Sequence, residues 1–276
     1  MAVVTGVTAI GWRAHAALAA SRGRAKVVAP LSWSLYAEAA GELIWVGPPR
    51  GPLHPRSVLA AAVPAAPHGD IVVAVGPAPP WRPQPPRMPD GAARDAVRSL
   101  RLALASLGPA RGLLGAGAVG ATDAALARAH PLIRAVGDAL SADRADAFAD
   151  AARRLLGLGE GLTPSGDDFI GGVLFARRSV ARAHDAAWAH AIERLVGDAP
   201  ALTHPVSACL LRDLAAGEGW AALHDLADAL ARDDAAAAGT ALRGLTALGQ
   251  SSGWDLLAGY VSGLEGLAAR VRMMDA

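Results

Sequence analysis

The middle of the chain carries one stretch of unusual composition, Gly157-Leu-Gly-Glu-Gly-Leu-Thr-Pro-Ser-Gly-Asp-Asp-Phe-Ile-Gly-Gly172. Its alternate glycines suit a backbone that takes positive φ or approaches a ligand closely. Pro164 is typical of the first turn of a helix, and the residues that follow it are mostly apolar. The stretch therefore predicts a glycine-rich loop that leads directly into an apolar helix.

Helical periodicity continues on both sides of this stretch. Short breaks of Gly, Pro or Asp separate predicted helices at 92–104, 121–140, 142–156, 166–182, 184–197, 204–215, 219–231, 234–247 and 252–270. Aromatic residues make up only 4% of the chain, so small apolar side chains must build the core. Such side chains suit closely packed helices.

The N-terminal part of the chain has a different pattern, in which Gly and Pro interrupt short apolar runs. Length and β-branched content predict strands at 25–29, 42–46 and 70–75. Residues 8–20 are predicted to form a helix before the first of these strands.

A proline-rich segment separates the two patterns. Seven prolines occupy the thirteen residues from Pro77 to Pro89, which predicts a stiff surface connection and a domain boundary. The predicted fold is α+β. Residues 1–90 are expected to form a small strand-rich (β or α/β) domain, and residues 91–276 a larger helical domain.

Composition excludes several classes of protein. The chain is 53% apolar and 18% charged, which is typical of a globular protein with a substantial core. The 26 basic and 25 acidic residues nearly cancel and form no basic run, so we expect no nucleic-acid partner. No segment resembles a signal peptide or a membrane span, which predicts a cytoplasmic protein. Cys209 lies in an apolar run and is predicted to be a buried structural thiol.

Part of the central stretch recurs 87 residues later in the sequence. The residues with identical partners at this offset are Gly157, Leu158, Ser165, Gly166, Asp168 and Gly172, which match Gly244, Leu245, Ser252, Gly253, Asp255 and Gly259. Two copies are too few for a solenoid. They predict instead two related loop–helix units that could meet across a pseudo-symmetric site.

The first copy has the chemistry of a small-anion site. The start of a helix offers unpaired N–H groups and a partial positive charge, and we expect the N–H groups of residues 159–166 to bind an anion. Thr163 and Ser165 add hydroxyl groups. Asp167 or Asp168 would accept a hydrogen bond from an amide or amine end of the ligand. The second copy would complete the site.

A simpler interpretation is helix capping. Ser165-x-x-Asp168 and Ser252-x-x-Asp255 both have the spacing of a capping box. Capping does not account for three alternate glycines or for the adjacent Asp167. Because two carboxylates repel an anion, they would face a cation or the N–H-bearing end of the ligand, or a hydrated Mg²⁺ would bridge them. The sequence identifies no set of metal ligands.

Two other motifs carry less weight. His204 lies at the start of a predicted helix, where a histidine is more often a cap or a packing residue than a base. Gly115-Ala-Gly-Ala-Val-Gly120 matches G-x-G-x-x-G, but a helical segment precedes it where a nucleotide-binding fold needs a strand.

The central stretch resembles the signature of the AllH family, which is linked to oxamate carbamoyltransferase. Ser207, the Gly217-Glu218 pair and Gly249-Gln-Ser-Ser-Gly253 with Asp255 resemble that family in order and spacing, so the likeness covers most of residues 150–270. The resemblance implies a role in purine or allantoin nitrogen catabolism. That enzyme exchanges a carbamoyl group between oxalurate and phosphate, and it needs several protein subunits.

Together, the residues and the resemblance give one hypothesis: the chain is an enzyme subunit that binds oxalurate or carbamoyl phosphate. The candidate catalytic residues are Asp167, Asp168 and Asp255. The candidate substrate-binding residues are Gly159, Gly161, Thr163, Ser165, Gly166, Ser207, Ser251, Ser252 and Gly253. The alternatives are a non-catalytic assembly subunit and a stand-alone hydrolase of a ureido compound.

Overall fold

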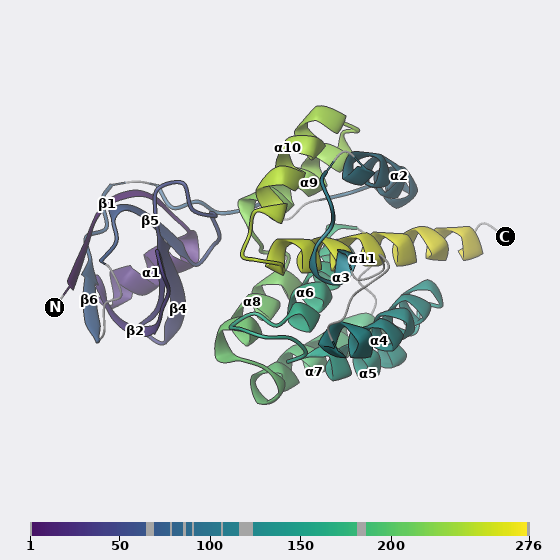
Figure 1. Cartoon of the computed structure of the whole chain (residues 1–276), viewed down its shortest axis with the longest axis horizontal. Coiled ribbons are helices and arrows are strands. Elements are labelled where there is room, and N and C mark those ends of the chain that lie inside the picture. The colour runs from purple at the N-terminus through teal and green to yellow at the C-terminus, as the bar shows by residue number, and fades with distance from the viewer. Residues whose placement is uncertain are drawn as a thin grey trace. The chain divides into compact units, whose positions relative to one another are not determined.

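A computed structural model describes residues 2–64, 69–77, 79–84, 87–89, 91–105, 107–115, 124–180 and 186–274. Internal contacts divide the chain into two compact units, Met1–Gln84 (unit 1) and Pro85–Ala276 (unit 2). Unit 1 is rich in strands and unit 2 is helical, as Figure 1 shows. The predicted α+β class, with a small strand-rich part before a larger helical part, is confirmed.

The strands of unit 1 form a closed barrel in the order β1-β5-β4-β3-β2-β6. Their bounds are β1 Ala2–Ile10, β2 Arg24–Pro30, β3 Leu35–Ala39, β4 Glu42–Gly47, β5 Ser57–Ala62 and β6 Asp70–Val73. Strand β1 pairs with β6, and β4 with β5, in parallel, whereas the other pairs are antiparallel. Helix α1 (Trp12–Ala20) packs against β3 and β4, and closure of the barrel pairs each of the six described strands on both sides.

The sequence located half of these strands. The predicted strands at 25–29, 42–46 and 70–75 correspond to β2, β4 and β6. The predicted helix at 8–20 was wrong at its start, because residues 8–10 end strand β1 and the helix begins only at Trp12. Val4 and Ile10 of β1 are buried in the barrel core, where pairing with β5 and β6 outweighs local helical preference.

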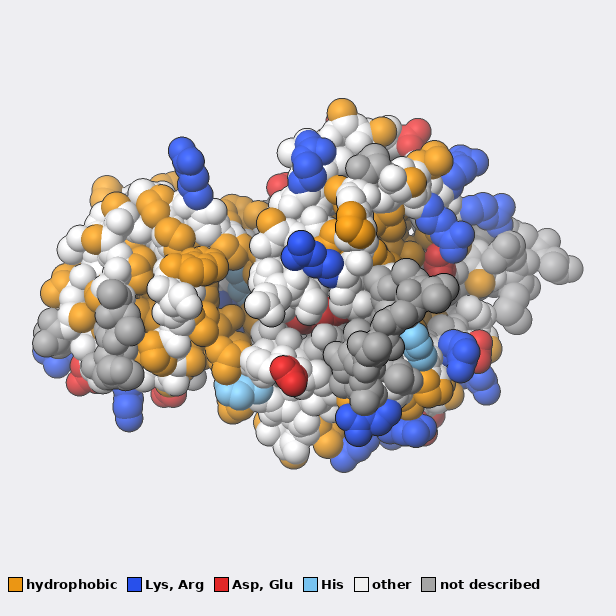
Figure 2. All heavy atoms as spheres, in the orientation of Figure 1, with side chains coloured by type: hydrophobic (Ala, Val, Ile, Leu, Met, Phe, Trp, Pro, Cys, Tyr) orange, Lys and Arg blue, Asp and Glu red, His pale blue; other side chains and the backbone are white. Residues whose placement is uncertain are grey.

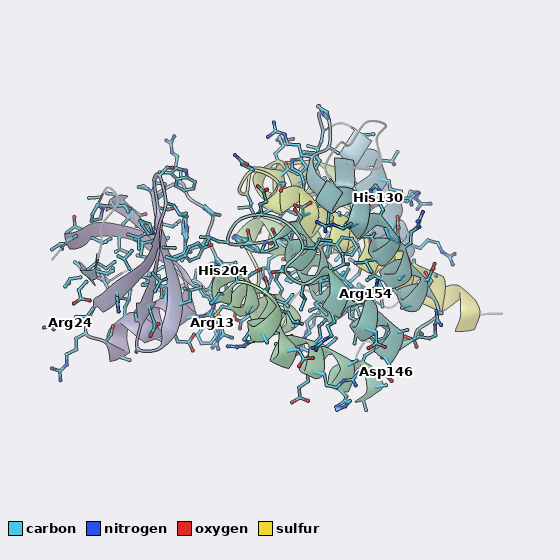
Figure 3. All side chains as sticks on the ribbon, turned by 60° about the horizontal axis from the view of Figure 1, so that its bottom comes forward. Arg13, Arg24, His130, Asp146, Arg154 and His204 are labelled. Atoms are coloured by element: carbon cyan, nitrogen blue, oxygen red, sulfur yellow. The ribbon has the colours of Figure 1, made fainter. Side chains whose placement is uncertain are left out.

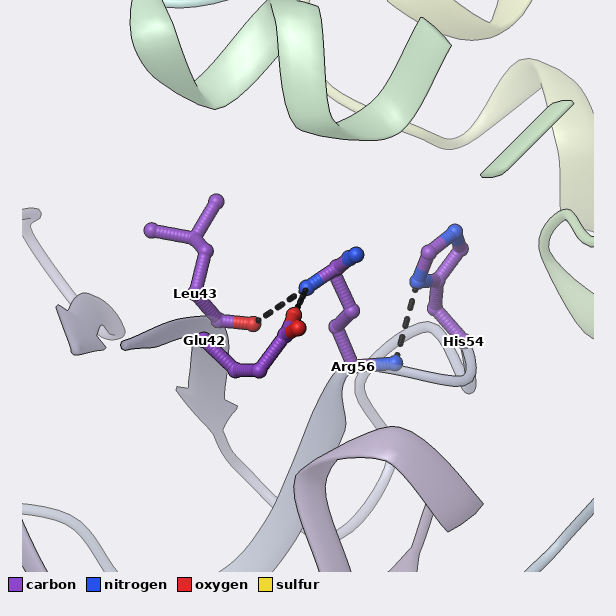
Figure 4. A network of polar contacts seen from close by, with 4 residues as sticks. All are labelled: Glu42, Leu43, His54 and Arg56. Atoms are coloured by element: carbon purple, nitrogen blue, oxygen red, sulfur yellow. Dashed lines mark hydrogen bonds and ion pairs between the residues drawn. The ribbon is translucent and has the colours of Figure 1, made fainter. Parts of the chain in front are cut away.

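A buried arginine ties together the loop between β4 and β5 (Figure 4). The Nη1 group of Arg56 donates to Oε2 of Glu42 at 2.7 Å and to the carbonyl oxygen of Leu43 at 3.1 Å. The backbone N–H of Arg56 donates to Nδ1 of His54 at 3.2 Å. The Arg56 side chain is almost fully buried and Glu42 is half-exposed, so this network fixes the end of the β4–β5 loop to the start of β4 near the surface of unit 1.

The proline-rich segment is attached to both units. The Trp81 N–H donates to the Ile10 carbonyl at 2.7 Å in unit 1, and the Met88 N–H donates to the Ser179 carbonyl at 2.7 Å in unit 2. Met88 is buried, so the expectation of a purely surface connection was wrong at that residue. The division between the units falls inside this segment. Independent domains at 1–90 and 91–276 stay a prediction.

Unit 2 contains every helix that the sequence predicted for it. The bounds are α2 Ala92–Ala105, α3 Gly112–Gly115, α4 Ala124–Ser141, α5 Ala145–Leu155, α6 Ser165–Ser179, α7 Ala186–Leu202, α8 Pro205–Ala215, α9 Ala221–Ala231, α10 Ala235–Thr246 and α11 Ser252–Met274. The four-residue α3 was not predicted, and residues 121–123, 181–182 and 184–185 of three predicted helices lie outside the described residues. No described helix has the length and hydropathy needed to cross a membrane.

Helices α6 and α11 form the centre of unit 2 and pack more extensively than any other pair of described helices. Glycines on both helices allow this close approach. A Cβ on Gly172 of α6 would lie 2.0 Å from the Leu256 carbonyl oxygen, and a Cβ on Gly259 of α11 would lie 1.8 Å from the Phe169 carbonyl oxygen. Helix α6 is buried on nearly all sides, between the hydrophobic core of α2, α9 and α10 and that of α4, α5 and α7.

Candidate functional site

The close approach of α6 and α11 brings their first turns together. Asp168 lies in the first turn of α6 and Asp255 in the first turn of α11, and their charges interact. Asp168 is 5% exposed and Asp255 is fully buried. The two copies of the Ser-Gly-x-Asp pattern therefore face each other across the α6–α11 contact.

Each aspartate receives a hydrogen bond from the serine of the opposite copy. The hydroxyl of Ser252 bonds to Asp168, and the hydroxyl of Ser165 bonds to Asp255. The loop before α6 adds Thr163, whose hydroxyl lies 3.0 Å from the hydroxyl of Ser252. This reciprocal pairing is a contact between the two helix starts, and it joins residues that lie 84 to 90 positions apart in the sequence.

One oxygen of each carboxylate remains without a hydrogen-bond partner in the described part of the chain: Oδ2 of Asp168 and Oδ2 of Asp255. Burial raises the pKa of Asp168 well above its ordinary value, and the charges of Asp255 and Asp167 raise it further, while Ser252 lowers it. Burial also raises the pKa of Asp255, against hydrogen bonds from the Leu113 N–H, Ser165 and Ser251. Each aspartate therefore keeps one buried oxygen whose hydrogen-bonding capacity is unused within the described part of the chain.

These acceptors lie close below the surface. Thr163, Ser165, Ser251 and Ser252 are all half-buried, whereas the aspartates behind them are buried. Figure 2 shows carboxylate atoms recessed in the middle of one face of unit 2. A ligand that approaches the hydroxyl groups from solvent would meet the carboxylates next.

Asp167 has a different task from Asp168. Its Oδ1 accepts from the Gly157 N–H at 2.7 Å, its Oδ2 accepts from the Thr203 hydroxyl, and the Ser207 hydroxyl also bonds to it. Burial raises its pKa, and these three donors lower it. Asp167 thus ties the glycine-rich loop to the start of α8. Its hydrogen bonds position that loop, and Ser207 contributes to the same set of contacts.

Helix capping does not explain the serine and aspartate of α6. The N-cap is Pro164, which has no side-chain cap, and the helix begins at Ser165. The N–H groups of Asp167 and Asp168 donate to the Pro164 carbonyl, and that of Gly166 donates to the Leu158 carbonyl. The sequence had suggested that the Gly166 N–H binds an anion, but this N–H is already bonded within the protein.

Different structural constraints explain why glycine occupies individual positions of the two loops. Gly159 has φ +127° and a Cβ there would lie 2.6 Å from the Ser165 nitrogen, whereas Gly161 has φ +88° and open space around it. A Cβ on Gly166 would lie 2.0 Å from the Leu155 carbonyl oxygen, and one on Gly253 would lie 1.9 Å from that of Leu245. Gly166 and Gly253 are therefore close-packing positions, and only Gly161 borders open space.

The two loops make similar contacts at Gly166 and Gly253. The four residues Leu155, Leu158, Leu245 and Leu248 show the structural match, because Leu155 and Leu158 contact Gly166 as Leu245 and Leu248 contact Gly253. Gly244, by contrast, lies inside α10, whereas its sequence partner Gly157 lies in the loop after α5 with φ +77°. The identity of Gly157-Leu158 with Gly244-Leu245 is therefore not a structural equivalence.

Three other sequence predictions have clear outcomes or limits. His204 is the N-cap of α8, where its Nδ1 accepts from the Val206 N–H at 3.2 Å (Figure 3), so the capping interpretation is confirmed. Cys209 is half-buried, so the expectation of a buried thiol was wrong. Residues 116–120 of the G-x-G-x-x-G match lie outside the described residues.

Sequence reasoning missed two contacts of the site. The Leu113 N–H of α3 donates to Oδ1 of Asp255 at 2.6 Å, a backbone contact that no side-chain pattern could reveal. Thr203 stands one residue before the cap of α8, and only its position near a helix start hinted at its bond to Asp167. The described residues contain no group of three or more His, Cys, Asp or Glu side chains placed to hold a metal.

Comparison with protein families places part of unit 2 in a known family model. Residues 155–264 match the family model described as oxamate carbamoyltransferase subunit AllH. The matched segment lies within unit 2 and contains the glycine-rich loop, Ser207 and both aspartates of the α6–α11 contact, so the family resemblance is confirmed over this part of the chain. A search of curated proteins and a search of solved structures found no match.

Proposed function

We propose that the chain is a subunit of an oxamate carbamoyltransferase-like enzyme of the cytoplasm, and that it binds a small carbamoyl-bearing anion, oxalurate or carbamoyl phosphate. The family match supports the subunit role, since the family is described as one subunit of that enzyme. Partner protein subunits, and a place in purine or allantoin nitrogen catabolism, belong to the same proposal.

The reciprocal pairing of Asp168 and Asp255 carries the proposal for the site. Ser252 and Ser165 donate their hydroxyl protons to these carboxylates, so each serine oxygen is left as an acceptor. A carbamoyl NH₂ group has two N–H donors and no charge, which suits such a set of acceptors. A ligand that lacks N–H donors would leave the buried Oδ2 atoms of Asp168 and Asp255 unpaired, at a cost of about 1–3 kcal/mol each.

Transfer of a carbamoyl group makes modest demands on a protein. In the reaction that the family name implies, a phosphate oxygen attacks the carbamoyl carbon of oxalurate, the C–N bond breaks, and the oxamate nitrogen takes a proton. Orientation of the two anions and stabilisation of the developing charge can supply much of the acceleration. Residues fixed by packed helices are suited to orientation, and Asp168 and Asp255 start the two most closely packed helices of unit 2.

Titration calorimetry tests the proposal, with oxalurate, carbamoyl phosphate, oxamate and phosphate added in turn to the purified chain. We expect saturable binding of the carbamoyl compounds and its loss in Ser252→Ala and Asp168→Asn. Ser179→Ala is a matched control, because Ser179 is a buried serine at the far end of α6 that bonds to the Phe175 carbonyl.

Two results would contradict the proposed site. One is equal binding by wild type and Ser252→Ala, and the other is absence of any binding to the wild-type chain, which would favour the assembly-subunit alternative. Co-purification with partner subunits then becomes the next measurement. Turnover of oxalurate by the chain alone, without phosphate, would instead identify the hydrolase alternative.

A further inference from the structure

We propose that Asp168 and Asp255 hold one divalent cation of the Mg²⁺ class between their Oδ2 atoms. The two side chains come from equivalent positions of α6 and α11, and each is more than nine-tenths buried. Each keeps one oxygen occupied, by Ser252 or by the Leu113 N–H, and leaves Oδ2 without a partner. Two buried carboxylates whose charges interact, each with one oxygen left open, indicate a site for a bound group.

Charge identifies the class of that group. Within the described part of the chain, no ion pair involves Asp168 or Asp255, although Arg98, Arg153 and other arginines pair with acidic side chains on the surface. Asp167 adds a third carboxylate, and its donors are neutral N–H and O–H groups. Buried carboxylates are normally paired with a cation or ligate a metal. A positive charge is therefore the partner that this cluster lacks.

The ligand atoms favour a hard cation. The described groups that hydrogen-bond to the two aspartates are the hydroxyls of Ser165, Ser251 and Ser252 and the Leu113 N–H, so every side chain among them offers an oxygen. Oxygen ligands suit Mg²⁺ and Mn²⁺, whereas Zn²⁺ prefers His and Cys. Mg²⁺ is commonly held by one or two carboxylates and keeps several waters, so two aspartates can hold it. Ca²⁺ takes about six to eight oxygen ligands, which is more than these two aspartates supply.

The cation also accounts for recognition of an anion, and in this respect the inference rests on the proposed function. The N–H groups of Gly166, Asp167 and Asp168 are already bonded within the protein, so the helix start offers little to a negative ligand. A cation held at the two Oδ2 atoms would offer its open coordination positions to the phosphate or carboxylate oxygens of the ligand. The serine oxygens beside it would accept from the carbamoyl NH₂ group.

Mn²⁺ titration of the purified full chain tests the cation site with no carbamoyl compound present. Free Mn²⁺ gives a strong electron paramagnetic resonance signal that falls when the ion is bound. We expect one Mn²⁺ bound per chain, displacement by excess Mg²⁺, and an affinity at least tenfold weaker in Asp255→Asn and in Asp168→Asn. Asp225→Asn is the matched control, since Asp225 is a partly buried aspartate of α9 whose pKa is also raised by burial.

The outcomes separate the cation from the anion. No stoichiometric Mn²⁺ binding by wild type, or equal binding by wild type and Asp255→Asn, overturns the cation site. Thermal melting of each variant shows whether it is folded. An increase of Tm on addition of Mg²⁺ in wild type and in Asp225→Asn, but not in Asp168→Asn or Asp255→Asn, supports the site. Because no carbamoyl compound is present, failure of this test leaves the calorimetric test of the proposed function intact.

Discussion

Gly259→Ala should destabilise unit 2 by an amount that can be worked out from the α6–α11 contact. The added Cβ would lie 1.8 Å from the Phe169 carbonyl oxygen, whereas a carbon and a carbonyl oxygen normally approach to about 3.3 Å. The helices would have to separate locally by roughly 1.5 Å, by that comparison. The obstacle is the backbone of a buried helix, so a change of rotamer cannot relieve it.

Overpacking of a core costs about 1–3 kcal/mol, and a rigid backbone obstacle places this case at the upper end. The Gly→Ala change in a helix offsets about 1 kcal/mol of that cost through helix propensity. The net expectation is a loss of about 2 kcal/mol in the free energy of unfolding. Gly172→Ala should behave similarly, because its Cβ would lie 2.0 Å from the Leu256 carbonyl oxygen.

Urea unfolding of unit 2 measures this loss, and Gly197→Ala is the control. Gly197 is an exposed residue of α7 with no atom within 4 Å of its added Cβ, so this variant should gain about 1 kcal/mol. Separation of the helices should also weaken the pairing of Asp168 with Ser252, and with it the binding of the ligand. A Gly259→Ala protein as stable as Gly197→Ala would refute the close approach of α6 and α11.

Three further predictions address the aspartates and the barrel. Because the folded state raises the pKa of Asp168 above its ordinary value of 3.8, its contribution to stability is fully present below that value and is lost as the pH rises through the folded pKa. The wild type should therefore lose more stability between pH 5 and pH 8 than Asp168→Asn does, and equal losses in urea unfolding would contradict the burial of this charge. Thr203→Val removes a hydroxyl donor from buried Asp167 and should cost about 1–3 kcal/mol in the same assay, whereas an unchanged midpoint would show that this contact is unimportant. Arg56→Met should cost unit 1 about 1 kcal/mol, at the low end because Glu42 is half-exposed and can be hydrated; stability equal to wild type would show that the network is not needed.

The helical half of the fold could be predicted because local signals suffice there. The ends of α5, α8 and α10 fall within a few residues of their predicted positions, since Gly, Pro and Asp breaks mark them. The barrel was harder, because β5 (Ser57–Ala62) is rich in alanine and pairs with the distant β1 and with β4. Its conformation depends on partners far away in the sequence, and no periodicity within six residues records them.

The candidate site follows the same rule. The serine and aspartate positions repeat in the sequence, so their assembly into one site could be anticipated, and the structure brings Asp168 and Asp255 together. The Leu113 N–H could not be anticipated, since it lies 142 positions from Asp255 and contributes a backbone atom. The separate task of Asp167 could not be predicted either, because adjacent aspartates in one helical turn point in different directions.

The difference between the two loops bears on how the proposed ligand would be oriented. From Leu155 to Gly166 the chain advances eleven positions, whereas from Leu245 to the corresponding Gly253 it advances eight. The longer first loop carries Thr163, whose hydroxyl contacts Ser252. The two carboxylates thus come from corresponding positions of α6 and α11, whereas the hydroxyls around them differ between the two loops. A carbamoyl-bearing anion has a neutral NH₂ end and a charged end, so this asymmetric set of hydroxyls would select one of its two orientations. Thr163→Val should therefore weaken binding of the carbamoyl compounds in calorimetry while leaving Mn²⁺ binding near the wild-type value, and equal weakening of both would contradict this division of labour.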